Sequence, residues 1–178
     1  MKKMLAFLFV LMFAAAPVQA QEPPQPNEVA VGKVLKAIAK LDAVTTFQKT
    51  LQLNIDGVKN SDGATKLNVP MKDIFDTAIS TSNSFSLLSL QTISIAKSSF
   101  GLAADAVDAA AAEFAANGES KEYFALMKTA GEYADEAIAY IEYADQLAII
   151  GLYYNGIALQ LTIPPNEGND PPPPPEQP

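Results

Sequence analysis

The sequence predicts a mainly α-helical fold, an alanine-rich antiparallel bundle of about four helices. Apolar residues recur three and four positions apart over long stretches, which is the period of an amphipathic helix. Of the 13 prolines, only Pro70 lies between residues 28 and 163. Alanine is frequent in the same stretch, and small side chains let helix axes approach closely. Together these observations favour a single helical domain over residues 28–163.

The two ends of the chain differ from this central stretch. Lys2 and Lys3 precede an unbroken apolar run at 5–16, and small residues lead up to Ala20. This pattern predicts a secretory signal peptide over 1–20, cleaved near Ala20 and too short in its apolar part to anchor in a bilayer. We expect a disordered N-terminal segment over 21–27 and a disordered, extended proline-rich tail over 164–178. The protein is therefore expected to be exported, to the periplasm or outside the cell.

Four helical segments are expected in the central stretch. The first begins near Glu28 and places apolar residues on one face up to Val44, with a row of lysines beside them. The second begins at Pro70, which a first helical turn tolerates, and runs towards Gly101. The third spans 102–116 and ends at Asn117-Gly118, a typical left-handed cap. The row of lysines comprises Lys33, Lys36 and Lys40.

The fourth segment begins near Ser120 and extends at least to Ile150. Mostly small residues recur along one side of it and predict a seam against neighbouring helices. This seam consists of Met127, Ala130, Ala134, Ala137, Ile141, Ala144 and Ala148.

Two similar pentapeptides allow a second interpretation. Residues 51–55 (LQLNI) and 159–163 (LQLTI) alternate apolar and polar positions, which is typical of a half-buried strand. Residues 67–69 would supply a third short strand after a turn at 60–63. The alternative to an all-helical bundle is thus a small β element from these three segments. We prefer the interpretation that the pentapeptides are the ends of helices.

The charge is acidic and unevenly distributed. Removing Lys2 and Lys3 with the signal peptide changes the net charge from −8 to −10. Residues 28–100 carry a balance of +2, whereas 101–163 carry −8. We expect the lysine row of the first helix to face the acidic last helix, although a basic partner for the acidic half is the alternative. An acidic chain without arginine is a poor ligand for nucleic acids and for anionic membrane surfaces.

The missing residue types exclude most catalytic chemistry. The chain has no histidine and no cysteine, so the usual general base, thiol nucleophiles and most metal sites are absent. Asp135 and Glu142 share one face of the last helix and are the remaining candidates for carboxylate or metal chemistry. We interpret them as solvated side chains. No enzyme activity, cofactor or metal is therefore expected.

Two uncharged stretches bear on function. Residues 77–96 contain eleven Ser, Thr, Asn or Gln residues and are too polar to face lipid, and 147–163 is short for a membrane span. The preferred hypothesis is an exported, non-enzymatic helical protein that acts by protein–protein interaction or self-assembly. The alternatives are a membrane-active or lipid-binding protein that uses 147–163, and an enzyme that relies on carboxylates alone. The candidate interface residues are Tyr133, Tyr140, Tyr143, Tyr153 and Tyr154. Tyrosine suits an interface because its ring can be buried there while its hydroxyl stays in contact with water.

Overall fold

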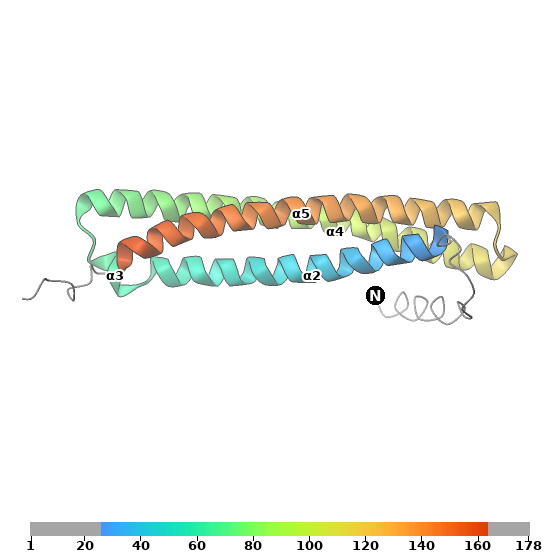
Figure 1. Cartoon of the computed structure of the whole chain (residues 1–178), viewed down its shortest axis with the longest axis horizontal. Helices are drawn as coiled ribbons and strands as arrows, with labels where there is room; N and C mark the ends of the chain where they lie inside the picture. Colours follow the sequence, from blue (N-terminus) through green and yellow to red (C-terminus); the bar gives the residue numbers. More distant parts are fainter. Residues whose placement is uncertain (1–25, 164–178) are drawn as a thin grey trace, which may run out of the picture.

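The computed structural model describes residues 26–163, which form three long helices and one single-turn helix (Figure 1). Helix α2 spans Pro26–Lys59, α3 Asp62–Thr65, α4 Val69–Asn117 and α5 Lys121–Thr162. The three long helices lie side by side along one axis, and α4 runs opposite to α2 and α5 (Figure 1). The predicted helical bundle is confirmed. The predicted signal peptide over 1–20, residues 21–25 of the expected N-terminal segment and the expected tail over 164–178 lie outside the described residues.

The core is built on a seven-residue repeat. In each long helix the buried positions alternate three and four residues apart, the spacing that keeps one seam turned towards neighbouring helices. All seven residues of the predicted α5 seam are buried, so this prediction is confirmed. The seam of α2 consists of Ala30, Val34, Ala37, Val44, Gln48, Leu51, Ile55 and Val58, with half-buried Leu41 in its one gap.

Helices α4 and α5 approach closely because the side chains between them are small. The hydroxyl of Ser82 donates to the carbonyl oxygen of Gly151 at 2.7 Å, and that of Ser89 donates to the carbonyl oxygen of Ala144 at 2.8 Å. Both serines are buried. A side chain as short as serine reaches the backbone of a neighbouring helix only where the two helices are close, so these bonds reflect the small residues between α4 and α5.

A buried amide links α2 to α4. The Nε2 atom of Gln48 donates to the carbonyl oxygen of Ser86 at 2.8 Å and to its Oγ at 2.6 Å. The Ser86 hydroxyl in turn donates to Oε1 of Gln52 at 3.2 Å. A polar residue in a helical core fixes the register of its helix, because sliding would leave its hydrogen bonds unmade.

Ion pairs along one side show that α2 and α5 run parallel. Lys33 pairs with Asp135 at 2.5 Å and Lys40 pairs with Glu142 at 2.6 Å, a constant separation of 102 positions in the sequence. Lys36 adds its charge at longer range. The expectation that the lysine row faces the acidic last helix is confirmed.

The predicted helix ends are confirmed at three places. Asn68 caps α4 by accepting from the backbone N–H of Met71, with Pro70 in the first turn. Gly118, at φ 68°, ends α4 in the left-handed region that favours glycine. Ser120 caps α5 by accepting from the N–H of Tyr123.

The expected break at Gly101 is wrong. Helix α4 continues through this residue, so the expected second and third segments form one helix of 49 residues. A glycine inside a helix costs about 1 kcal/mol. Ala103 and Val107 are buried just after it, and their packing against α2 and α5 outweighs that cost.

The β alternative for residues 51–55, 67–69 and 159–163 is also wrong. Leu51 and Ile55 are buried four residues apart inside α2, while Leu53 between them is 72 % exposed. Positions four apart satisfy both the helical and the strand period, so the alternation was ambiguous. Residues 159–162 form the last turn of α5, and Val69 begins α4. The preferred helical interpretation is confirmed, and residues 26–163 contain no strand.

Candidate interaction surface

An apolar stripe runs along the outer side of α4. Its members lie seven residues apart and therefore share one side of a helix in this seven-residue geometry. None carries a charge, and the four large ones are exposed. We call this set the α4 stripe, which consists of Ile74, Thr81, Leu88, Ile95, Leu102, Ala109 and Ala116.

Apolar side chains of α5 continue the α4 stripe. Ile150, Tyr154 and Ile157 are four and three residues apart on one side of α5, and Tyr143 precedes Ile150 by seven. The ring of Tyr154 stacks on Phe85 of α4 with the ring centroids 6.0 Å apart, so this side of α5 borders α4. We call the α4 stripe together with Tyr143, Ile150, Tyr154 and Ile157 the α4–α5 face.

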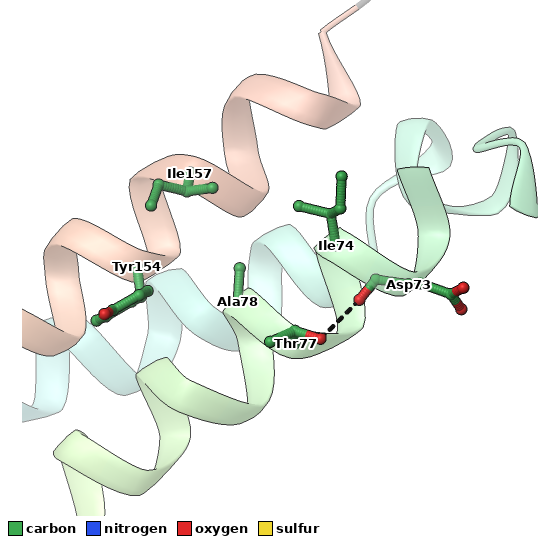
Figure 2. Close-up of a pocket in the computed structure, with 6 residues that line it drawn as sticks. All are labelled: Asp73, Ile74, Thr77, Ala78, Tyr154 and Ile157. Carbon is green, nitrogen blue, oxygen red and sulfur yellow. Dashed lines mark hydrogen bonds between the residues drawn. The ribbon is translucent and has the colours of Figure 1, made fainter. Parts of the chain in front are cut away.

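A shallow hollow of about 350 Å³ marks the point where the two helices meet (Figure 2). Ile74 and Ala78 border it from α4, and Tyr154 and Ile157 border it from α5. The carboxylate of Asp73 points away from the hollow (Figure 2). The hollow is therefore lined almost wholly by apolar atoms.

Four hydroxyl groups on and beside the α4 stripe are already hydrogen-bonded within α4. Thr81 donates to the carbonyl oxygen of Thr77 at 2.8 Å, and Thr77 donates to that of Asp73 at 2.8 Å. Ser84 and Ser98 make the same bond to residues four positions earlier. A hydroxyl that has found a backbone acceptor adds little to the cost of covering the surface. The α4–α5 face is consequently more apolar than its composition indicates.

The other sides of the bundle carry charges. Lys33, Lys40, Asp135 and Glu142 line the contact of α2 with α5. On the α4–α5 face, charges begin beyond Ile95. Glu136 continues the row of Tyr143 and Ile150 on α5 at about the level of residue 97 of α4, and Asp105 follows on α4. The uncharged part of the face thus runs from Ile74 to Ile95, about 30 Å at 1.5 Å per residue.

The five predicted interface tyrosines divide into three groups. Tyr143 belongs to the α4–α5 face and is 56 % exposed, whereas Tyr153 is 66 % exposed and touches Tyr154 edge-on with the ring centroids 5.5 Å apart. Tyr133 and Tyr140 are half-buried against the core. The structure therefore brings Tyr143 and Tyr154 to one surface, places Tyr153 at its border, and uses Tyr133 and Tyr140 for packing.

Sequence reasoning missed the α4 stripe. The signal that would have found it is the seven-residue spacing of Leu88, Ile95 and Leu102, which continues from Ile74 through the uncharged stretch 77–96. The number of polar residues in 77–96 does not reveal the α4 stripe, because a count does not separate one side of a helix from another.

The carboxylates considered for chemistry are held by lysines. Because Lys40 donates a hydrogen bond to Glu142 and adds its positive charge, the pKa of Glu142 is lowered. Asp135 is paired with Lys33. Within residues 26–163, no three acidic side chains gather where they could hold a metal ion. The arrangement of Asp135 and Glu142 serves helix pairing.

A third carboxylate supports the connection between α4 and α5. Glu113 accepts hydrogen bonds from Ser120 at 2.6 Å and from Asn117 at 3.0 Å, and these bonds lower its pKa. This contact fixes the turn at one end of the bundle.

Comparisons with known proteins provide no relative. The chain matches no family model, no curated protein and no solved structure. None of the helices in the described part is long and apolar enough to cross a membrane.

Proposed function

We propose that this is an exported, non-enzymatic helical protein that acts by contact with another protein, and that the α4–α5 face is the contact surface. The observation that carries the proposal is the α4 stripe, an exposed apolar row without charge beside the apolar side of α5. Single exposed apolar residues are ordinary on protein surfaces, but a contiguous apolar patch is typical of an interaction site.

The composition of the α4–α5 face supports this proposal. The central parts of protein interfaces are depleted in charge and enriched in aromatic residues. The face has Tyr143 and Tyr154 beside Leu88, Ile95 and Ile150, and no charged side chain belongs to it between the levels of Ile74 and Ile95. Its hydroxyls are bonded within α4, so covering it leaves few polar groups without partners.

The missing residue types support the non-enzymatic part of the proposal. Without imidazole or thiol groups, the remaining candidates for proton transfer are carboxylates, lysines and tyrosines. Asp135 and Glu142, the pair that shares a face, each have a lysine Nζ within 2.6 Å. A carboxylate stabilised as the anion is a weak base at neutral pH.

A site-specific photo-crosslinker tests the contact surface. Benzoylphenylalanine at position 95 is expected to capture a protein when the mature protein is exported by its own cell. Position 90 is the matched control, because Leu90 is 45 % exposed and Ile95 47 %, but Leu90 lies four residues after Ser86, which faces α2. The readout is the mass of each adduct. A probe at position 95 that captures no more protein than one at position 90 contradicts the proposal.

A second candidate function is membrane contact through residues 147–163. It is favoured by the exposed Ile149, Leu152 and Leu159, which surround the uncharged end of α5. The net charge of −10 after signal cleavage opposes approach to an anionic bilayer. The same photo-crosslinker at position 153 separates the two candidates, since adducts with lipid there, and none with protein at position 95, favour the membrane.

A further inference from the structure

We infer that residues 171–175 of the same chain, five consecutive prolines that we call the proline run, dock on the α4–α5 face over the hollow beside Tyr154. There the proline run covers the part of the face from Ile74 to Leu88, to which the proposed partner also needs access. The inference uses the surface of the proposed function and adds an occupant from within the chain that regulates this access. It is carried by the apolar hollow, by the place where α5 ends and by the composition of residues 164–178.

The hollow lies at the end of the bundle where α5 finishes. The helix stops just before Ile163, whose backbone is extended, with φ −83° and ψ 120°. Ile157 and Tyr154 of the hollow lie six and nine residues before Ile163, about 9 and 14 Å along the helix axis. Helix α2 begins at the other end of the bundle (Figure 1). Of the two segments outside the described residues, the one over 164–178 therefore leaves the bundle beside the hollow.

The residues between α5 and the proline run are long enough to reach back over the hollow. The seven residues 164–170 span about 22 Å at about 3.1 Å per residue in an extended chain, which exceeds the distance along α5 from Ile163 to the hollow. They include Asn, Gly and Asp, the residue types that favour a reversal of direction. The proline run itself extends about 16 Å at the same rise, about ten residues of α-helix, or the distance from Ala78 to Leu88 on α4.

The side chains of the hollow are of the kind that bind a polyproline helix. Such a helix docks in grooves lined by aromatic side chains. Tyr154 stacks on Phe85 with the ring centroids 6.0 Å apart, and Tyr153 lies edge-on to Tyr154. Ile74 and Ile157 border the hollow from the two helices (Figure 2). Proline rings can pack on these side chains, and tyrosine hydroxyls can donate to proline carbonyl oxygens, which have no partner within a polyproline helix.

The hollow is neutral, as an uncharged occupant requires. Residues 77–96 of α4 and 146–163 of α5 contain no charged side chain. Asp76, near the start of α4, is paired with Lys72. The carboxylate of Asp73 borders the hollow in sequence but points away from it (Figure 2). A charged segment would lose its hydration here without gaining an opposite charge, whereas the proline run has no charge to lose.

The acidic residues of the segment lie on either side of the proline run. Glu167 and Asp170 precede it and pass the end of the bundle, where Asp62 and Lys66 lie together and balance each other. Glu176 follows the run and emerges close to the level of Leu88, where its carboxylate can stay in water. Docking the proline run therefore brings no carboxylate into the hollow.

The acidic residues of α5 do not oppose Glu176 at this position. Glu136 lies at about the level of residue 97 of α4, roughly 14 Å beyond Leu88. Glu142 is paired with a lysine of α2. Asp145 follows Gly131 by two seven-residue steps, and Gly131 faces α2.

Attachment to α5 favours the proline run over a separate protein. A segment on a short linker has an effective concentration on the order of millimolar at a site that the linker can reach. A contact with an intrinsic Kd of about 0.1 mM is then occupied about 90 % of the time. Another protein must displace the proline run before it reaches this part of the α4–α5 face.

Disulfide formation within the chain tests the docking, because the chain has no cysteine of its own. Mature Thr77→Cys/Pro173→Cys is expected to give an internally linked monomer under mild oxidation at micromolar concentration, because position 77 borders the hollow. Thr50→Cys/Pro173→Cys is the matched control. Both threonines are exposed and donate to carbonyl oxygens four residues earlier, and they lie eight and nine residues from helix ends at the same end of the bundle. We expect the link to position 77 to form at least fivefold faster.

A second variant changes the proline run without changing the length or charge of the segment. Residues 171–175 are replaced by Gly-Ser-Gly-Ser-Gly, and a single Thr77→Cys is labelled with a bulky maleimide. Labelling is expected to be at least threefold faster with the Gly-Ser sequence than with the proline run, because the hollow is then uncovered. A single Thr50→Cys is expected to react equally fast with both sequences. Circular dichroism checks that the helix content is unchanged.

The outcomes separate the inference from the proposed function. Equal linking rates at positions 77 and 50, or equal labelling of Thr77→Cys with the two sequences, overturn the docking. Covalent dimers in place of internally linked monomers overturn the same chain as the source of the occupant. The photo-crosslinker at position 95 lies about 10 Å beyond Leu88, outside the part that the proline run covers. Docking without a protein adduct at position 95 keeps the inference and removes the proposed function, and an adduct without docking does the reverse.

Discussion

At the scale of single residues, the space around each position between the helices decides how large a side chain fits there. Gly131 of α5 faces Ala30 and Lys33 of α2, and Gly151 lies between Leu51 of α2 and the backbone of Ser82 in α4. Both are buried and both are helical. They differ in the room around them, and this difference predicts opposite effects of the same substitution.

Gly131→Ala is expected to stabilise the protein and Gly151→Ala is not. A Cβ at 131 would lie 3.6 Å from its nearest neighbours, an ordinary contact, so the gain in helix propensity of about 0.5–1 kcal/mol remains. A Cβ at 151 would lie 3.2 Å from Leu51 Cδ2 and 3.3 Å from the Ser82 carbonyl oxygen. Because the backbone of α4 must move, we expect Gly151→Ala to be about 1–2 kcal/mol less stable than Gly131→Ala. Urea unfolding of the mature variants measures the difference, and equal midpoints would contradict the assigned closeness of α4 and α5.

At the scale of the helices, α4 shows how packing overrides weak local preferences. Its central part is rich in Ser and Thr, which are poor residues for a helix interior because their hydroxyls compete for the backbone. Several of these hydroxyls donate to carbonyl oxygens four residues earlier, as those of Thr77, Thr81 and Thr92 do, and the buried Ser82 and Ser89 donate to α5. These hydroxyls therefore bond to the backbone without interrupting the helix. Burial of Ile79, Ile93 and Val107 then supplies the stability that propensity lacks.

Two substitutions at Gly101 test the continuity of α4. An added Cβ has no neighbour within 4 Å, so Gly101→Ala is expected to raise the free energy of unfolding by about 0.5–1 kcal/mol. Gly101→Pro is expected to lower it by about 3 kcal/mol, because proline removes the hydrogen bond to residue 97 and clashes with the preceding turn. Chemical unfolding monitored by circular dichroism measures both. If Gly101 instead joined two separate helices, proline would be tolerated there.

At the scale of the whole molecule, the three helices present sides of different chemistry. The contact between α2 and α5 is flanked by ion pairs, and the α4–α5 face is apolar and uncharged in the half between Ile74 and Ile95. The ion pairs are exposed, so they orient the parallel pair of helices more than they stabilise it. The α4–α5 face is the side that we propose for contact with another protein.

The pairing of α2 with α5 should depend on pH through Glu142. Its pKa in the folded protein is lowered from the ordinary value of 4.5, mainly by the hydrogen bond from Lys40. The contribution of the pair is therefore fully present above pH 4.5 and is lost as the pH falls below this value through the folded pKa. Lys40→Met is expected to melt at a lower temperature than the wild-type protein at pH 7, and this difference should shrink below pH 4.5.

Lys36→Met is the matched control for this pH dependence, because Lys36 affects Glu142 only through its charge at longer range. Its melting temperature should differ less from that of the wild-type protein at every pH. High salt should reduce the Lys40 effect, since both partners are partly exposed. A Lys40→Met difference that is the same at pH 3 and pH 7 would contradict the assignment.

Features that depend on a few neighbouring residues were readable from the sequence alone. The cap at Asn117-Gly118 and the helix start at Ser120 follow from local hydrogen bonding and backbone freedom. The seam of small residues on α5 and its pairing with the lysine row follow from periodicity and charge, which also determine the class of fold. These predictions held because each rests on interactions within a turn or two of helix, or on a simple match of opposite charges.

Only the tertiary structure decided which segments continue as helix and which sides meet. Gly101 and the alternating residues 51–55 are ambiguous locally, and burial against the other helices resolves both as helical. The uncharged stretches 77–96 and 147–163 are apparent in the sequence, but their juxtaposition in the α4–α5 face depends on how each helix is rotated about its axis. That rotation is set by the close contacts of Ser82 and Ser89 with α5, which no local pattern specifies.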